Sequence, residues 1–200
     1  MELVRLTQDK VAIRNALLAK RRGIAPSVAD AKGKAIRERL EGLPEYAGAE
    51  GLCVYVSSKD NEVDTHDLIQ RALDQGRSVS VPIAGARGRL LWSRLRALDE
   101  LAPNRFGILE PLPEFRRMAL PDSRSVVVVP GIGFTPGGGR IGYGGGYFDR
   151  FLSGFRGVSI ALAYGLQVVE SLPQTAHDIP VDLVVTESEV YRRTTADQSP

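Results

Sequence analysis

The sequence predicts a single α/β domain in which helices flank a mostly parallel central sheet. Short apolar runs alternate with longer amphipathic segments along the chain, which is the pattern of α/β proteins. One run, Val126–Val129, consists of four consecutive valines, and its lack of polar alternation is typical of a strand buried on both faces. The 200 residues suffice for a substantial core and contain no repeat or linker-like break. We expect residues 1–193 to form one domain and the polar residues 194–200 to be a disordered tail.

The composition excludes several classes of protein. The formal net charge is only +2, and aromatic residues are not interleaved with basic ones, so nucleic-acid binding is not expected. A signal peptide and a long apolar run are both missing from the sequence, which argues against a membrane location. The single cysteine, Cys53, lies in an apolar run and indicates a buried residue in a reducing compartment. We therefore expect a cytoplasmic protein.

The N-terminal part of the chain predicts two helices. Thr7 is a suitable N-cap for a helix over residues 8–22, because its hydroxyl can accept a hydrogen bond from a free backbone amide. Ser27, with Asp30 three residues later, resembles a capping box that opens a second helix ending near Leu40.

The first of these helices carries a basic stripe. At about 100° per residue, Lys10, Arg14 and Arg21 fall within a narrow sector, while Val11 and Leu18 are expected to supply packing contacts. Such a stripe is commonly a solvated face. The alternative is that it faces an anion bound elsewhere in the fold.

The next segment predicts a strand, a polar turn and a helix. The strand covers Leu52–Ser57, and Asp64 or Thr65 caps a helix that runs to about Gln75. Glu62 lies between the two, where α/β proteins place ligand-binding residues. A solvated loop carboxylate is an equally good interpretation of this residue.

The rest of the chain predicts further strands around an irregular segment. Ser78–Pro82 and Leu90–Leu95 are expected strands, the second at an edge or in a hairpin, and the proline-rich segment 96–121 is expected to be irregular. Gly157–Ala163 predicts another strand. Asp182 opens the last one, so that its side chain lies at the end of that strand.

The most informative stretch is the glycine-rich segment between Ser125 and Leu152. It combines the buried valine strand, nine glycines between Gly131 and Gly146, and the start of a helix at Tyr147. This order places backbone amides around an anion, and glycine lets a ligand approach the backbone closely. Arg140 could pair with phosphate oxygens, and Asp149 could hold a bridging metal. The segment is not a Walker A loop, and a flexible surface loop is the alternative.

Several motifs of the chain resemble those of the 5-formyltetrahydrofolate cyclo-ligase (methenyltetrahydrofolate synthetase) family. The strongest is Val-Pro-Gly at residues 129–131, followed by RIGYGGGYFDR at residues 140–150. Others are Lys-x-x-x-Arg at residues 10–14, Glu-x-x-Thr at residues 62–65, and Gly-x-x-Glu-Pro at residues 107–111. The late run His-Asp-x-Pro-Val-Asp at residues 177–182 also matches. Ile141 replaces the usual leucine, and Phe148 replaces a tyrosine whose hydroxyl is lost here.

The resemblance implies a three-layer α/β/α fold similar to that of sugar-phosphate isomerases and CoA-transferases. It also implies an enzyme that uses ATP as co-substrate, with Mg²⁺, to convert 5-formyltetrahydrofolate into 5,10-methenyltetrahydrofolate, ADP and phosphate. Family resemblance assigns the metal to Asp149 and Asp182, and the folate to Glu62 and Tyr147. Arg140 and Lys10 are the implied catalytic residues. The implied ATP-binding residues are Lys10, Arg14, Gly139, Arg140, Ile141, Gly142, Tyr143, Gly144, Gly145, Gly146 and Tyr147.

The sequence alone leaves two other functions open. One is a paralogue that kept the ATP loop but lost folate turnover, and the other is a sugar-phosphate isomerase or CoA-transferase relative. The retention of Glu62 argues against the first, and the two expected metal carboxylates argue against the second. The expected partners are small molecules only, and the expected state is a monomer or a weak homodimer.

Overall fold

The computed structural model describes residues 2–194, with side chains of the first helix described from Asp9 onward. The predicted tail therefore lies almost wholly outside the described residues. The helices are α1 (Glu2–Arg22), α2 (Pro26–Glu41), α3 (Pro44–Ala47), α4 (His66–Asp74) and α5 (Tyr147–Leu152). Short 3₁₀ turns cover Ala86–Gly88, Leu98–Glu100, Pro113–Phe115 and Gly165–Gln167.

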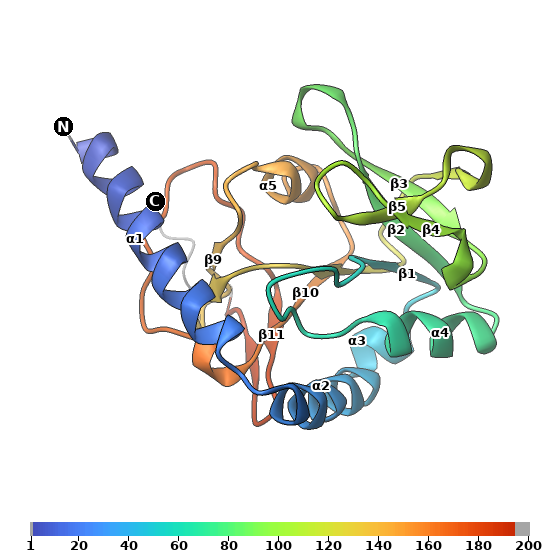
Figure 1. Cartoon of the computed structure of the whole chain (residues 1–200), viewed down its shortest axis with the longest axis horizontal. Helices are drawn as coiled ribbons and strands as arrows, with labels where there is room; N and C mark the ends of the chain where they lie inside the picture. The colour runs from blue at the N-terminus through green and yellow to red at the C-terminus, as the bar shows by residue number, and fades with distance from the viewer. Residues whose placement is uncertain (1, 195–200) are drawn as a thin grey trace.

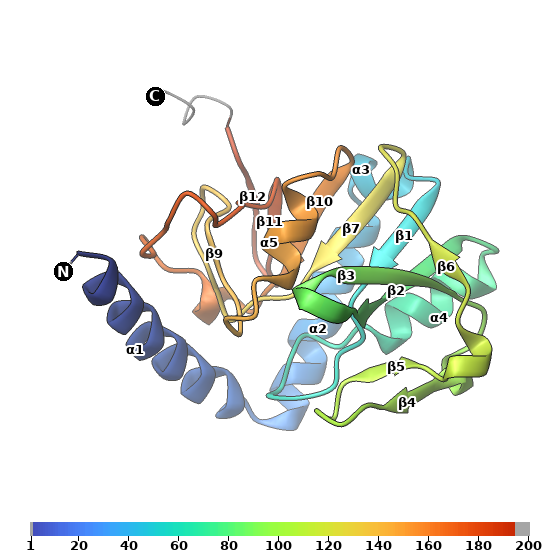
Figure 2. The same ribbon diagram turned by 90° about the horizontal axis from the view of Figure 1, so that it is seen from above.

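The central sheet is mostly parallel, as the sequence predicts (Figures 1 and 2). Its parallel strands are β1 (Gly51–Val54), β2 (Ser78–Ala84), β7 (Ser125–Val129), β10 (Val158–Leu162) and β11 (Leu183–Val185). The antiparallel strands are β3 (Leu90–Leu95), β6 (Met118–Ala119) and β12 (Val190–Arg192). The order is β12-β11-β10-β7-β1-β2-β3-β6, so the antiparallel strands lie at the two edges.

Helices cover both faces of this sheet. On one face, α2, α3 and α4 pack against alternate residues of the central strands, such as Leu52, Val79 and Val126. On the other face, α5 packs with Phe148, Phe151 and Leu152 against a cluster that includes Trp92 and Val127. The four valines of β7 are fully buried because they contribute to both layers.

Two small hairpins extend the fold beyond the sheet. One pairs β4 (Leu101–Pro103) with β5 (Leu109–Pro111), and the other pairs β8 (Gly133–Phe134) with β9 (Arg140–Ile141). Glu110 anchors the first hairpin, because its carboxylate accepts hydrogen bonds from the Ala84 amide and the Asn104 side chain, each at 3.0 Å.

Three expectations about the ends of elements are wrong. Helix α1 begins at Glu2, so Thr7 lies inside it rather than at its cap. Helix α2 begins at Pro26 with Ala25 as N-cap and no capping side chain; proline starts the helix because it needs no amide partner there. The strand that follows Asp182 is not the last one, since β12 returns antiparallel to it.

The order in which strands are added to the sheet changes direction between β1 and β7. After β1 it moves outward through α4 to β2, and β7 then pairs with the other side of β1. The segments that leave the carboxyl ends of β1 and β7 therefore diverge. In open α/β sheets a binding crevice forms at such a switch point.

We predict that Gly138 is required for the β8–β9 hairpin. Its φ is +83°, and an added Cβ would lie 2.1 Å from the carbonyl oxygen of Val181. Gly76 is a matched control, with φ +71° but no atom within 4 Å of an added Cβ. Gly76→Ala should lower the free energy of unfolding by about 1–2 kcal/mol, the cost of left-handed backbone. Gly138→Ala should lower it clearly more in urea denaturation, and equal losses would contradict the predicted clash.

Candidate active site

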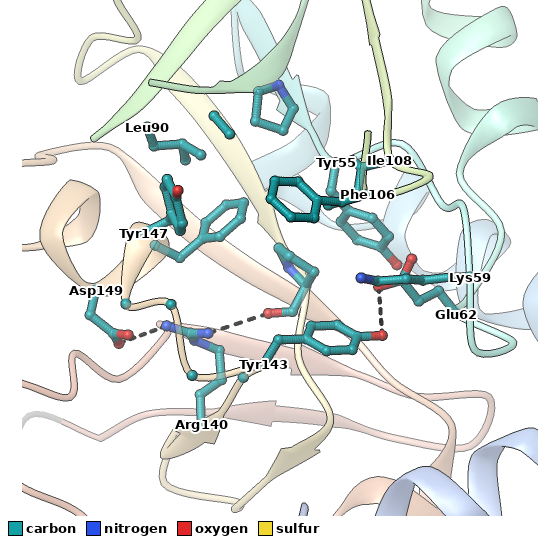
Figure 3. Close-up of a pocket in the computed structure, with 18 of the residues that line it drawn as sticks. Tyr55, Lys59, Glu62, Leu90, Phe106, Ile108, Arg140, Tyr143, Tyr147 and Asp149 are labelled. Carbon is teal, nitrogen blue, oxygen red and sulfur yellow. Dashed lines mark hydrogen bonds and ion pairs between the residues drawn. The ribbon is translucent and has the colours of Figure 1, made fainter. Parts of the chain in front are cut away.

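A cavity of about 720 Å³ opens at the switch point (Figure 3). Its lining comes from α1, the loop after β1, the carboxyl end of β2, the β4–β5 hairpin and the glycine-rich segment that leads into α5. One end is formed by glycine backbone and cations, which we call the glycine-loop end. The other is formed around Glu62 and is mostly aromatic and aliphatic, and we call it the Glu62 end.

The glycine-loop end presents a row of unused backbone donors. Within the described part of the chain, the amides of residues 142–146 donate no hydrogen bond. Arg14 fixes the start of this row by donating from Nε to the Gly142 carbonyl at 2.8 Å. Unsatisfied amides that line a cavity are suited to bind an anion.

Arg140 lies beneath this row as a buried cation. It donates from Nη2 to Oδ1 of Asp149 at 2.6 Å and from Nη1 to the Pro130 carbonyl at 3.5 Å. Its Nε is buried and finds no partner among the described residues. The guanidinium therefore keeps donor capacity beside the cavity, while Asp149 compensates its charge.

Asp178 is a site residue that the sequence analysis missed. It lines the cavity and accepts a hydrogen bond from Nζ of Lys10. Burial opposes its ionisation, but the hydrogen bonds from Lys10 and Thr175 outweigh this and hold the pKa of Asp178 below its ordinary value. Asp149 accepts from the amide of Ile179 at 3.2 Å, so the two carboxylates lie on neighbouring segments.

The structure does not bring Asp182 to this cavity. Asp182 precedes β11, at the amino end of a parallel strand, whereas the cavity lies at the carboxyl ends. Its carboxylate accepts from the Ser159 hydroxyl at 2.7 Å and from Arg193 at 3.1 Å. The expectation that Asp182 shares a metal with Asp149 is therefore wrong for this structure, because the two side chains lie at opposite edges of the sheet. Strand polarity could have indicated this in the sequence, because a residue just before a buried run faces the opposite edge.

Gly139 of the predicted ATP site and Val11 of the first helix lie differently from what was expected, while Ile141 lines the cavity and also contributes to the core. Gly139 belongs to the β8–β9 turn, where its amide donates to the Thr135 hydroxyl at 3.0 Å, and it does not line the cavity. The side chain of Ile141 packs against Leu17 in a buried cluster. Val11, expected to pack, is 46% exposed and lines the cavity.

The remaining predicted residues gather around the cavity. They are Lys10, Arg14, Glu62, Arg140, Ile141, Gly142, Tyr143, Gly144, Gly145, Gly146, Tyr147 and Asp149. Lys10 and Arg14 of the basic stripe face this space, which supports the anion interpretation over a solvated face. Arg21, the third member, is buried behind it.

The Glu62 end holds a carboxylate in a largely apolar setting. Oε2 of Glu62 accepts from the Ser58 amide at 3.2 Å, and Oε1 lies 3.4 Å from the Tyr143 hydroxyl. Burial raises the pKa of Glu62 above its ordinary value, although the Ser58 amide, Arg21 and Lys59 act in the opposite direction. Apolar side chains surround it, namely those of Tyr55, Val56, Phe106, Ile108 and Leu109.

Sequence reasoning also missed the exposed ring of Phe106. It lies at the tip of the β4–β5 hairpin, is 61% exposed, and reaches the cavity. Gly107, with φ +73°, completes the turn that carries it. An aromatic residue in a predicted turn was the available signal, since its ring can stack on a flat ligand.

The two ends together suit a pair of ligands with different chemistry. Free amides and three cations fit a polyphosphate, and a partly desolvated carboxylate between aromatic rings fits a flat heterocycle with several N–H donors. Among the described residues, no group of three or more His, Cys, Asp or Glu side chains could hold a metal alone. A metal here would need ligands from a bound molecule.

Comparisons with known proteins identify the family. Residues 6–187 match the family model described as the 5-formyltetrahydrofolate cyclo-ligase family. The chain belongs to this family of enzymes. It is 33% identical over 178 residues to the 5-formyltetrahydrofolate cyclo-ligase of Escherichia coli K12, covering 86% of this chain and 97% of that one. It is 27% identical to the mitochondrial enzyme of Arabidopsis thaliana, covering 94% and 78% of the two chains.

A solved structure agrees with this assignment, and a second one shares the fold. The fold matches that of Aquifex aeolicus 5,10-methenyltetrahydrofolate synthetase with a TM-score of 0.81 and 29% identity, covering 96% of each chain. The fold also matches the synthetase from Mycoplasma pneumoniae with a TM-score of 0.72 and 18% identity. In the described residues, none of the helices of this family member is long and apolar enough to cross a membrane.

We predict that Glu62 opposes folding when it is ionised. Because its folded pKa is raised, the folded state favours the protonated form, and stability from this group is lost as pH rises through that pKa. Glu62→Gln, which is neutral at every pH, should therefore raise the free energy of unfolding at pH 7 more than at pH 4. Glu114→Gln, at an exposed site, should show no such difference. Urea denaturation at both pH values measures this, and a Glu62→Gln effect independent of pH would contradict it.

Proposed function

We propose that this chain cyclises 5-formyltetrahydrofolate to 5,10-methenyltetrahydrofolate with ATP and Mg²⁺, releasing ADP and phosphate. The observation that carries the proposal is one cavity with two unlike ends, a row of free amides with cations at one and a desolvated carboxylate at the other. Membership of the cyclo-ligase family, and the printed names of its relatives, support the same reaction.

The reaction needs phosphoryl transfer because the formyl oxygen is a poor leaving group. In the proposed order of steps, this oxygen attacks the γ-phosphorus of ATP. The bond between that phosphorus and the oxygen bridging to the β-phosphate breaks, and ADP is released. Nitrogen 10 of the folate then attacks the activated carbon. The carbon–oxygen bond breaks, its electron pair leaves with phosphate, and the proton on nitrogen 10 passes to solvent.

The chain's own contribution is positioning and charge neutralisation, as in other phosphoryl transfers. The amides of residues 142–146 would hold phosphate oxygens, and Lys10, Arg14 and Arg140 would offset the charge that moves onto the leaving ADP. Tyr147 lines the cavity next to this loop and would form a wall for the ligands. The reaction requires no covalent nucleophile from the protein.

At the other end, Glu62 would hold the pterin ring. A pterin offers adjacent N–H donors, and both oxygens of a carboxylate can accept them. Phe106 at the cavity mouth would cover the ring, since an exposed aromatic side chain can stack on a flat heterocycle.

The residues fit a magnesium ion between Asp149 and Asp178. In each carboxylate the hydrogen bonds from described residues go to one oxygen only, Oδ1 of Asp149 and Oδ2 of Asp178, which leaves the other oxygen free. Magnesium prefers oxygen ligands and is commonly held by one or two carboxylates, substrate phosphates and water. When bound, it would supply charge neutralisation at the phosphates.

The direct test is an assay of the purified protein with ATP, Mg²⁺ and 5-formyltetrahydrofolate. We expect the near-ultraviolet absorbance of the methenyl product to appear, with one ADP formed per product. Glu62→Gln should weaken the apparent affinity for the folate by about tenfold or more, the scale of one charged hydrogen bond, and leave ATP affinity unchanged. Glu114→Gln is the control. Absence of product with the parent protein would refute the proposed function, and equal loss of both affinities would refute the folate role of Glu62.

A second prediction separates Asp178 from Asp182. Asp149→Asn and Asp178→Asn should raise the Mg²⁺ concentration needed for half-maximal turnover by at least about tenfold, the lower end for residues that only support metal ligands. Asp182→Asn removes a carboxylate of the same type that faces Ser159 and Arg193 instead, so its magnesium dependence should match the parent's. If Asp182→Asn changed the Mg²⁺ concentration needed for half-maximal turnover, or if Asp178→Asn did not, the assignment of the metal to Asp149 and Asp178 would be contradicted.

A further inference from the structure

Tyr143 belongs to the glycine loop, but its side chain reaches the Glu62 end. Its backbone lies between Gly142 and Gly144, inside the row of free amides. Its hydroxyl accepts a hydrogen bond from Nη2 of Arg21 at 2.7 Å. The single hydroxyl proton can go to Oδ2 of Asp60 at 3.0 Å or to Oε1 of Glu62 at 3.4 Å (Figure 3). One residue therefore contributes to both ends of the cavity.

Arg21 makes the position of this hydroxyl well defined. Its side chain is 1% exposed and donates to three segments: the Asp60 carbonyl at 2.7 Å, the Gly131 carbonyl at 2.9 Å, and Tyr143. No carboxylate among the described residues lies within ion-pair distance of it. A buried guanidinium with these partners is a rigid anchor, because moving it would leave donors unsatisfied.

A cation also contacts the face of the Tyr143 ring. Nζ of Lys59 lies 4.5 Å from the ring centroid, a cation–π geometry. Lys59, Asp60 and Glu62 all belong to the loop between β1 and α4. The glycine loop thus contacts the Glu62-bearing loop through one side chain, which is 40% exposed and lines the cavity.

The rest of the glycine loop has few ties of its own. Arg14 donates to the Gly142 carbonyl and Arg150 to the Gly145 carbonyl, while the amides of residues 142–146 donate to no described residue. A ligand that accepts from these amides would restrict the loop and, with it, Tyr143. A ligand on Glu62 would restrict the same residue from the other side. The ligand that binds first would order part of the loop and Tyr143, so the second ligand would lose less conformational entropy when it binds.

We propose that Tyr143 is a positioning residue that couples the two substrate sites, so that nucleotide and folate each tighten the binding of the other. The inference rests on the proposed function, since that names the two ligands. Coupling of this kind is reciprocal: the factor by which nucleotide strengthens folate binding equals the factor by which folate strengthens nucleotide binding.

The experiment measures this factor by calorimetry. A non-hydrolysable ATP analogue with Mg²⁺ is titrated into the protein with and without saturating 5-formyltetrahydrofolate, and the folate is titrated with and without the analogue. For the parent we expect both affinities to rise by about fivefold or more, a typical size for such coupling. In Tyr143→Phe, which keeps the ring over Lys59 and removes only the hydroxyl, the factor should fall to within about twofold of one.

The controls separate coupling from other losses. Tyr191→Phe removes a hydroxyl on β12, away from the cavity lining, and should keep the parental factor. Each variant serves as its own reference, so a uniform change in affinity or in melting temperature does not alter the factor. A parent that binds and converts both substrates without mutual tightening would overturn the coupling while leaving the proposed function intact. A parental factor in Tyr143→Phe would overturn the role of Tyr143, and failure of either ligand to bind the parent would refute the proposed function and the coupling with it.

Discussion

The parallel pairing of β1 with β7 is the constraint on which the rest of this structure depends. In this register Leu52 lies beside Val126 and Val54 beside Val128, so both strands end at the same edge of the sheet. Their exits must diverge, because β2 already occupies the other side of β1. The Glu62 loop and the glycine-rich segment, far apart in sequence, thereby form opposite ends of one cavity.

Several charged residues of the cavity form ion pairs, but some of their hydrogen-bonding atoms remain unused. Arg140 is paired with Asp149 and Lys10 with Asp178, so neither cation lies uncompensated beside the sheet. Among the described residues, the Nε of Arg140 and one oxygen of each carboxylate have no hydrogen-bond partner. A divalent cation that accompanies an anionic ligand would reduce the net charge brought into this arrangement.

Glu62, in contrast to Asp149 and Asp178, forms no ion pair with a described residue. Its carboxylate is partly desolvated, which raises its pKa, while the hydrogen bond from the Ser58 amide and the charges of Arg21 and Lys59 favour the ionised form. Under the proposed function, a ligand with several N–H donors would supply further hydrogen bonds to this carboxylate. The network of Arg21, Tyr143 and Glu62 thus links this carboxylate to a loop whose amides also lack partners.

The sequence by itself determined the fold class and the family, and most of the site residues that it predicts line the cavity. The valine run, the glycine-rich segment and the basic stripe are local patterns, and each has a direct structural meaning. The sequence did not determine which aspartate accompanies Asp149, or that Tyr143 would reach Glu62. Asp178 and Asp182 are four positions apart in similar surroundings, and only the direction of β11 places one at the cavity and the other at the far edge. The position of Tyr143 depends on a contact with Glu62 between segments more than eighty residues apart, and chain packing alone decides it.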